Sequence, residues 1–156
     1  IKAFVFDVAG VLTNGDLLIS ESGELLRTMN VKDGFAMKYA IDNEYLITII
    51  SGGTNEAVRE RLVKLGIHQV FLGSDNKIKE LEKLAKENNL KKEEILVMGD
   101  DILDIPILKN AGISCCPQDA VQEVKKICDY VSFKKGGCGA VREIIEQVMK
   151  IQKKWI

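Results

Sequence analysis

Short apolar segments alternate along the chain with longer segments in which apolar residues recur every three or four positions. The short segments are nearly continuous and rich in β-branched or aromatic residues, a pattern typical of strands that are buried on both faces of a parallel sheet. The predicted strands span Lys2–Phe6, Tyr45–Ile50, Gln69–Leu72, Ile95–Gly99, Gly112–Cys115 and Tyr130–Ser132.

The longer segments predict helices between these strands. In the strongly charged segment Asp75–Asn89, the residues Ile78, Leu81 and Leu84 fall on one helical face. Another helix is expected to begin with Asp33 as its N-cap. The other predicted helices span Thr54–Leu65, Ile105–Asn110, Asp119–Ile127 and Ala140–Gln152. Because strands and helices alternate, the chain is predicted to form an α/β fold with a doubly wound parallel sheet.

The pattern changes between about residues 15 and 30. Two short extended segments, Asp16–Ser20 and Glu24–Met29, flank the turn signal Glu21-Ser22-Gly23 and predict a β-hairpin flap. Its apolar side chains outnumber those that an isolated hairpin should expose, so they are expected to form an oligomer interface or, alternatively, to cover their own domain. These side chains are Leu17, Leu18, Ile19, Leu25 and Leu26.

Composition indicates a single domain that spans residues 1–156. Of the 156 residues, 46% are hydrophobic and 29% are charged, which suits one compact unit with its own core. The net charge is −1 with both signs interspersed, so no basic surface points to nucleic acid or to a membrane as a partner. No apolar run approaches the roughly 20 residues that span a bilayer, and a cytoplasmic location is expected.

The cysteines and the single histidine exclude two classes of site. The cysteines Cys115, Cys116, Cys128 and Cys138 lack the Cys-x-x-Cys spacing of zinc sites and are expected to be reduced thiols in or near the core. His68 lies in a turn and is expected to be structural or exposed to solvent. A chain with one histidine offers no obvious Ser-His-Asp or Cys-His machinery, which excludes a large class of hydrolases.

Polar residues that follow the predicted strands carry the candidate chemistry. Asp7 follows the first strand, and open α/β sheets bind their ligands at this carboxyl edge. Ser51-Gly52-Gly53 follows another strand and precedes a helix, so a hydroxyl and backbone N–H groups are available for an anion such as phosphate. An ordinary turn or cap is the alternative at each position.

Three carboxylates, Asp100, Asp101 and Asp104, follow the strand Ile95–Gly99. They would repel one another unless a cation lies among them, and a magnesium ion would fill that role. Lys77 opens a predicted helix, where its charge opposes the helix dipole. The lysine is therefore either solvated or offset by a local anion.

Together these signals resemble a known family over the whole chain. Asp7, Ser51, Lys77 and the acidic cluster that begins at Asp100 match, in order and local context, the four motifs of the haloacid dehalogenase superfamily. More narrowly, the chain looks like the phosphatases of 3-deoxy-D-manno-octulosonate 8-phosphate, an eight-carbon sugar acid phosphate of lipopolysaccharide synthesis. The segments that carry this narrower resemblance are Asp7–Gly15, Asn30–Gly34, Gly99–Asp104 and Gly136–Glu143.

The resemblance implies a Rossmann-like fold in which the hairpin replaces a larger cap domain, and it implies a mechanism. Asp7 would attack phosphorus and form an aspartyl-phosphate. Mg²⁺ would be held by Asp7, Asp100 and the main-chain oxygen of Ala9. Asp101 and Asp104 would orient the ligands of the metal, or Asp104 would simply cap the next helix.

The resemblance also implies which residues bind the substrate. Ser51, the backbone N–H of Gly52 and Lys77 would hold the phosphoryl oxygens. A sugar acid calls for cationic partners, for which Lys32 and Arg142 are the leading candidates. The tail lysines Lys134 and Lys135 are further candidates.

Ala9 departs from the family pattern. Relatives usually carry an aspartate two residues after the nucleophile, where it protonates the leaving oxygen and then activates the attacking water. A methyl group cannot move a proton, so hydrolysis of an alkyl phosphate is predicted to be impaired. Three explanations stay open: an engineered change that traps a complex, a natural relative that binds without turnover, and another group that supplies the proton.

Assembly and substrate identity follow from the same resemblance. It implies a homotetramer in which neighbouring subunits close each active site and a C-terminal tail, about residues 134–156, reaches toward active sites. Many relatives carry arginine where Gly53 and Lys32 stand, so a nine-carbon sialic-acid-type phosphate is the alternative substrate. A non-catalytic module for oligomerisation or ligand binding is the alternative function.

Overall fold

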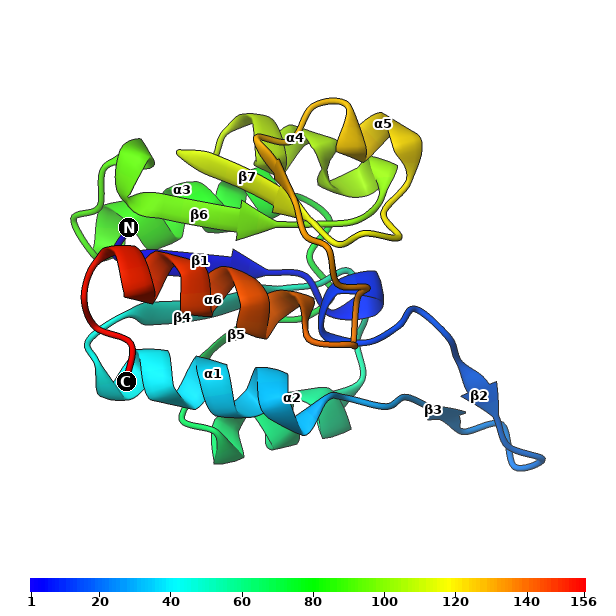
Figure 1. Cartoon of the computed structure of the whole chain (residues 1–156). Helices are drawn as coiled ribbons and strands as arrows, with labels where there is room; N and C mark the ends of the chain where they lie inside the picture. Colours follow the sequence, from blue (N-terminus) through cyan, green and yellow to red (C-terminus); the bar gives the residue numbers. More distant parts are fainter.

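The computed structural model describes residues 1–156 and confirms the α/β fold with one parallel sheet. The six strands lie in the order β5-β4-β1-β6-β7-β8, with β1 between β4 and β6 (Figure 1). Their bounds are β1 (Ala3–Phe6), β4 (Leu46–Ile50), β5 (Gln69–Phe71), β6 (Ile95–Met98), β7 (Ile113–Cys116) and β8 (Tyr130–Val131). The strand order changes direction beside β1, which is where open α/β sheets form a ligand-binding crevice.

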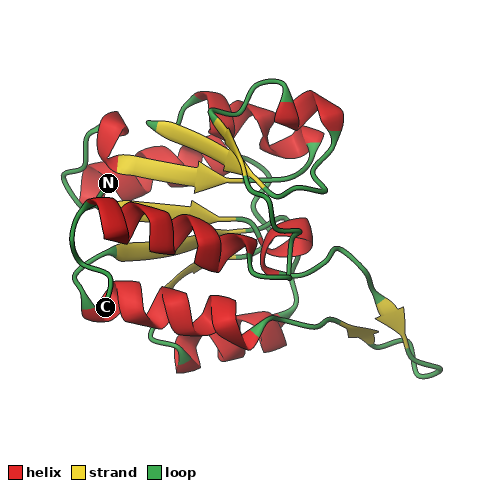
Figure 2. Cartoon of the chain, in the orientation of Figure 1, coloured by secondary structure: helices red, strands yellow, loops and turns green.

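Helices cover both faces of the sheet (Figure 2). One layer consists of α1 (Val31–Asp42), α2 (Glu56–Lys64) and α6 (Ala140–Ile151), and the other of α3 (Lys77–Glu87), α4 (Ile105–Lys109) and α5 (Gln122–Lys125). Alternate residues of β1 enter opposite layers, since Phe4 and Phe6 pack with the first layer and Ala3 and Val5 with the second. Burial on both faces explains the continuous apolar strands of the sequence. Three short helical turns complete the chain: η1 (Val8–Leu12), η2 (Lys92–Glu94) and η3 (Ile102–Asp104).

The predicted hairpin is present as β2 (Leu18–Ile19) paired antiparallel with β3 (Leu25–Leu26). It projects away from the body of the molecule at the edge where the arrowheads of the strands end (Figure 1). Leu18 is 67% exposed and Ile19 is 70% exposed. Within one chain, Leu18 and Ile19 therefore do not cover their own domain, whereas Leu25 and Leu26 are partly covered and line a pocket with Ala57 and Val58 of α2.

The N-cap prediction for α1 is wrong. The helix begins at Val31, because the side-chain oxygen of Asn30 accepts a hydrogen bond from the backbone N–H of Lys32 at 2.8 Å. Asp33 is instead buried and accepts from the backbone N–H of Arg142, 109 residues away, at 2.8 Å. Asp33 thus joins the starts of α1 and α6 rather than capping its own helix.

The expectations for the cysteines and the histidine are confirmed. All four cysteines are free thiols, with Cys115 and Cys116 buried, and His68 is exposed. None of the helices combines the length and the apolar character that crossing a membrane would require.

Candidate active site

The loop after β1 brings Asp7 close to the loop after β6. Gly10 makes this approach possible, because it has a φ of 74° and any Cβ atom there would collide with the carboxylate of Asp100. The side chain of Asp7 is 13% exposed, and that of Ala9 faces solvent. The nucleophile candidate therefore lies at the carboxyl edge of the central strand, as predicted.

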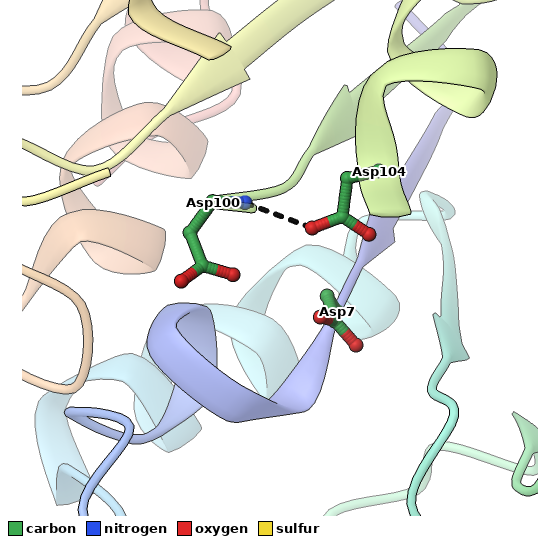
Figure 3. A group of neighbouring side chains, drawn as sticks. All are labelled: Asp7, Asp100 and Asp104. Atoms are coloured by element: carbon green, nitrogen blue, oxygen red, sulfur yellow. Dashed lines mark hydrogen bonds between the residues drawn. The ribbon is translucent and has the colours of Figure 1, made fainter. Parts of the chain in front are cut away.

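Asp104 organises the loop after β6. One of its carboxylate oxygens, Oδ2, accepts a hydrogen bond from the backbone N–H of Asp100 at 2.9 Å (Figure 3). The same oxygen accepts from the backbone N–H of Asp101 at 3.3 Å. Asp104 is 2% exposed, so these bonds are shielded from water. The alternative that the Asp104 side chain caps the next helix is wrong, because it makes no capping hydrogen bond to α4. It instead forms a capping box at η3 with Asp101 as the N-cap.

Lys77 neutralises part of the acidic cluster. Its Nζ lies 2.6 Å from Oδ1 of Asp104 and 3.1 Å from Oδ1 of Asp7. The carboxylates of Asp7 and Asp104 are thus the local anions that offset the unfavourable charge of Lys77 at the start of α3. The lysine is not solvated, because only 13% of its side chain is exposed. Burial disfavours the ammonium, but the attraction of Asp7 and Asp104 outweighs burial and raises the pKa of Lys77.

The carboxylates of Asp7, Asp100 and Asp104 converge (Figure 3), with one oxygen of each within 4.8 Å of the others. Burial and the repulsion of Asp104 and Asp7 raise the pKa of Asp100 to about 7. The pKa of Asp7 is also raised, by burial and by Asp104, against the opposing attraction of Lys77. One lysine therefore does not balance three carboxylates.

The cluster fits a hard cation. Oδ1 of Asp7 accepts no hydrogen bond, although the ammonium of Lys77 lies within ion-pair distance of it. Both oxygens of Asp104 already have partners, namely Lys77 and two backbone N–H groups. Asp7 and Asp100 are consequently the members with oxygens available for a metal, and carboxylate oxygens are the ligands that Mg²⁺ prefers.

An open cleft of about 850 Å³ lies above the cluster. Eight of the predicted site residues line it: Asp7, Ala9, Ser51, Gly52, Lys77, Asp100, Asp101 and Asp104. Ser51 is 5% exposed, and its Oγ accepts a hydrogen bond from the backbone N–H of Gly53 at 3.2 Å. The structure therefore assembles residues from four separate loops around one opening.

Lys32 and Arg142 do not line this cleft. Both line a separate pocket of about 680 Å³ at the starts of α1 and α6. The guanidinium of Arg142 lies 5.7 Å from the ring centres of Phe35 and Trp155 and pairs with Glu146 at 3.3 Å. Within a single chain, packing of α1 against α6 brings Lys32 and Arg142 to each other, so their role in binding the sugar acid stays a prediction.

The sequence did not reveal what the glycine-rich tail does. The backbone N–H of Gly137 donates to the carbonyl of Val11 at 2.9 Å, and a Cβ atom on Gly136 would collide with the carbonyl of Gly10. The two tail glycines thus allow the chain to pack directly on the loop that follows Asp7. Two consecutive glycines in the sequence indicate a close approach of the backbone to another segment, but they do not tell which loop the tail contacts.

Comparison with known proteins agrees with this geometry. Residues 63–145 match the family model of haloacid dehalogenase-like hydrolases. The chain is 32% identical to the 3-deoxy-D-manno-octulosonate 8-phosphate phosphatase of Escherichia coli K12 over 99% of this chain and 82% of the relative. It is 34% identical to the enzyme of that name from Haemophilus influenzae, over 99% of this chain and 86% of the relative.

Solved structures of similar proteins have the same fold. The phosphatase of that name from Yersinia pestis superposes with a TM-score of 0.96 at 30% identity, covering 99% of this chain and 83% of the other. The one from Moraxella catarrhalis, solved with a magnesium ion, a phosphate ion and a KDO molecule, superposes with a TM-score of 0.95 at 29% identity, covering 99% and 89%. The chain belongs to the 3-deoxy-D-manno-octulosonate 8-phosphate phosphatase family of haloacid dehalogenase-like hydrolases, a family of phosphoric monoester hydrolases.

Proposed function

We propose that the chain is a Mg²⁺-dependent phosphatase that hydrolyses 3-deoxy-D-manno-octulosonate 8-phosphate to the free sugar acid and phosphate. The observation that carries this proposal is the convergence of Asp7, Asp100, Asp104 and Lys77 in one cleft. The Moraxella catarrhalis relative, which binds magnesium, phosphate and KDO, supports the choice of metal and substrate.

In the proposed reaction, the carboxylate of Asp7 attacks phosphorus and the bond from phosphorus to the sugar oxygen breaks. The sugar oxygen takes its proton from solvent, and water then hydrolyses the aspartyl-phosphate to release phosphate and restore Asp7. Asp7, Asp100 and the main-chain oxygen of Ala9 would hold Mg²⁺, which would supply the positive charge that lets two anions meet. Ser51 Oγ and the N–H of Gly52 hold phosphoryl oxygens. Lys77 orients Asp7 and attracts the same phosphoryl group.

Ala9 is proposed to slow this reaction, because its methyl group cannot donate a proton to the leaving oxygen. The same residue favours a second candidate function, a module that binds the sugar acid phosphate without turnover. The intact ion-pair cluster argues against the second candidate, since a purely structural role gives no reason to keep three partly buried carboxylates around one lysine.

Phosphate release in the presence of Mg²⁺ tests the function. The eight-carbon substrate is expected to be hydrolysed faster than a nine-carbon sialic-acid-type phosphate, and a neutral sugar phosphate serves as the reference. Faster release from the nine-carbon compound would reassign the substrate. If neither acid phosphate is hydrolysed, even with aspartate at position 9, the chain is a binding module.

Mg²⁺ is expected to stabilise the protein more at about pH 8 than at about pH 6. In the ion-free protein the pKa of Asp100 is about 7, above its ordinary 3.8, because of burial and the neighbouring Asp104 and Asp7. Below pH 7 the folded protein therefore holds a proton on Asp100, and this proton stabilises the folded state. The stabilisation is lost as the pH rises through about 7. Above that pH the ionised carboxylate of Asp100 is free to bind Mg²⁺ instead. Thermal unfolding with Mg²⁺ and with a chelator measures the difference.

The variant Asp75→Asn is a suitable control for this measurement, because Asp75 is an exposed carboxylate at the rim of the same cleft and is not part of the converging cluster. Its unfolding should show nearly the same dependence on Mg²⁺ and pH. A Mg²⁺ shift that is equal at both pH values, or absent, would contradict the proposed ligand role of Asp100.

A homotetramer is proposed as the working assembly. The exposed apolar side chains of the hairpin would be buried against neighbouring subunits, and Lys32 or Arg142 would serve the active site of a neighbour. Light scattering should give the mass of four chains at micromolar concentration. The double variant Leu18→Ser/Ile19→Ser should give a smaller mass without loss of the fold, and a monomeric parent would end this proposal.

A further inference from the structure

A small side pocket opens from the cleft beside Ala9. It has a volume of about 60 Å³ and shares Ala9, Ser51 and Gly53 with the main cleft. The pocket has room for a few water molecules or for one small polar group. The short side chains of Ala9 and Gly53 leave this space open.

Charge limits what the main cleft itself can bind. Its lining includes five aspartates and a single cation, Lys77, which already pairs with Asp7 and Asp104. One Mg²⁺ would offset part of the negative charge of these aspartates, and the phosphoryl group of the substrate would bring negative charge back into the cleft. A second anionic group on the substrate would therefore be repelled unless another cation lies nearby.

Arg27 supplies a cation in the side pocket. It follows β3 at the base of the hairpin, is half-buried and lines the pocket together with Ala9 and Ser51. One guanidinium N–H donates to the carbonyl of Leu25 at 3.1 Å, and no carboxylate lies within ion-pair distance of Arg27. The guanidinium is permanently charged, and most of its five N–H donors are available.

We propose that Arg27 binds the carboxylate of the substrate in this side pocket and thereby selects sugar acid phosphates over neutral sugar phosphates. A guanidinium and a carboxylate are both planar and carry opposite charges, so the two oxygens of one carboxylate can accept two parallel N–H hydrogen bonds from an arginine. Ser51 lines both spaces, so a ligand whose phosphoryl group lies at Ser51 has a path for its carboxylate into the side pocket toward Arg27. This inference rests on the proposed function, which identifies the substrate as a sugar acid phosphate.

Binding to the chain with Ala9 tests the inference, because slow turnover leaves the intact ester in place. Calorimetry in the presence of Mg²⁺ compares the sugar acid phosphate with the phosphate ester of a matched sugar that lacks the carboxylate. Arg27→Gln should weaken binding of the acid by about ten- to a hundredfold and leave binding of the neutral ester nearly unchanged. If either ligand is hydrolysed, KM from initial rates replaces the dissociation constant.

Two further variants separate recognition from structure. Arg27→Lys keeps the charge and should retain part of the preference for the acid. Arg59→Gln makes the same substitution at an arginine that pairs with Glu56 at 2.9 Å and does not line the cleft, so it should leave both affinities unchanged. Unchanged thermal unfolding of Arg27→Gln would show that the hairpin base stays folded.

Two results would overturn the inference. Equal weakening of both ligands by Arg27→Gln would mean that Arg27 acts on the phosphoryl group or on the hairpin itself. Unchanged binding of the acid would mean that its carboxylate lies elsewhere. Neither result depends on catalysis, so failure of the inference is distinct from failure of the proposed function, which phosphate release by the Ala9→Asp variant measures.

Discussion

Replacing Ala9 by aspartate is expected to raise turnover of the sugar acid phosphate by at least about a hundredfold, since general acid–base catalysis contributes roughly 10²–10⁴ in rate. The site allows the change, because the Ala9 side chain is exposed and lines the cleft beside Asp7 and the open side pocket. Steady-state phosphate release from the parent and from Ala9→Asp measures the gain.

The gain should depend on the leaving group. An aryl or acyl phosphate expels an oxygen that needs no proton, so Ala9→Asp should accelerate its hydrolysis far less than that of the sugar phosphate. Ala57→Asp adds the same carboxylate at an exposed alanine of α2 outside the cleft and should change neither rate. If Ala9→Asp is as slow as the parent on the sugar phosphate, the assigned role of position 9 is wrong.

Asp7→Asn, made in the Ala9→Asp protein, is expected to reduce phosphate release by about 10⁴ or more. The change removes the proposed nucleophile, and the loss of such a group costs several orders of magnitude. It also removes one of the two carboxylates with an oxygen available for the metal. Lys77 keeps its 2.6 Å contact with Asp104, so the fold should survive the substitution.

Two measurements complete this test. Acid quenching during turnover, followed by mass spectrometry, should detect a phosphoryl group on Asp7 in the Ala9→Asp protein and none in the Asp7→Asn variant. Asp75→Asn, which neutralises an exposed carboxylate at the rim of the same cleft, should change the rate by much less. Undiminished turnover by Asp7→Asn would require another nucleophile.

Much of the site was predictable because its residues follow the strands directly. Asp7 follows β1, Ser51 follows β4 and Asp100 lies just beyond β6, and parallel strands end at a common edge. The continuous apolar segments predicted the strands, and the polar residue after each strand predicted which side chains lie at the carboxyl edge of the sheet. The positions of Lys32 and Arg142 could not be predicted in this way, because neither residue follows a strand and both depend on how α1 packs against α6.

The amino-acid sequence alone determined the alternation of strands and helices and the positions of the acidic and Ser-Gly-Gly loops, and the resemblance to a known family pointed out the departure at Ala9. Periodicity and residue chemistry are local properties, so they can be read without a fold. Only the tertiary structure decided that Lys77 pairs with Asp104 across 27 residues, that Asp33 holds the start of α6, and that Arg27 lines a pocket beside Ala9. These contacts join distant segments, and the order of the strands and the packing of the helices bring those segments together.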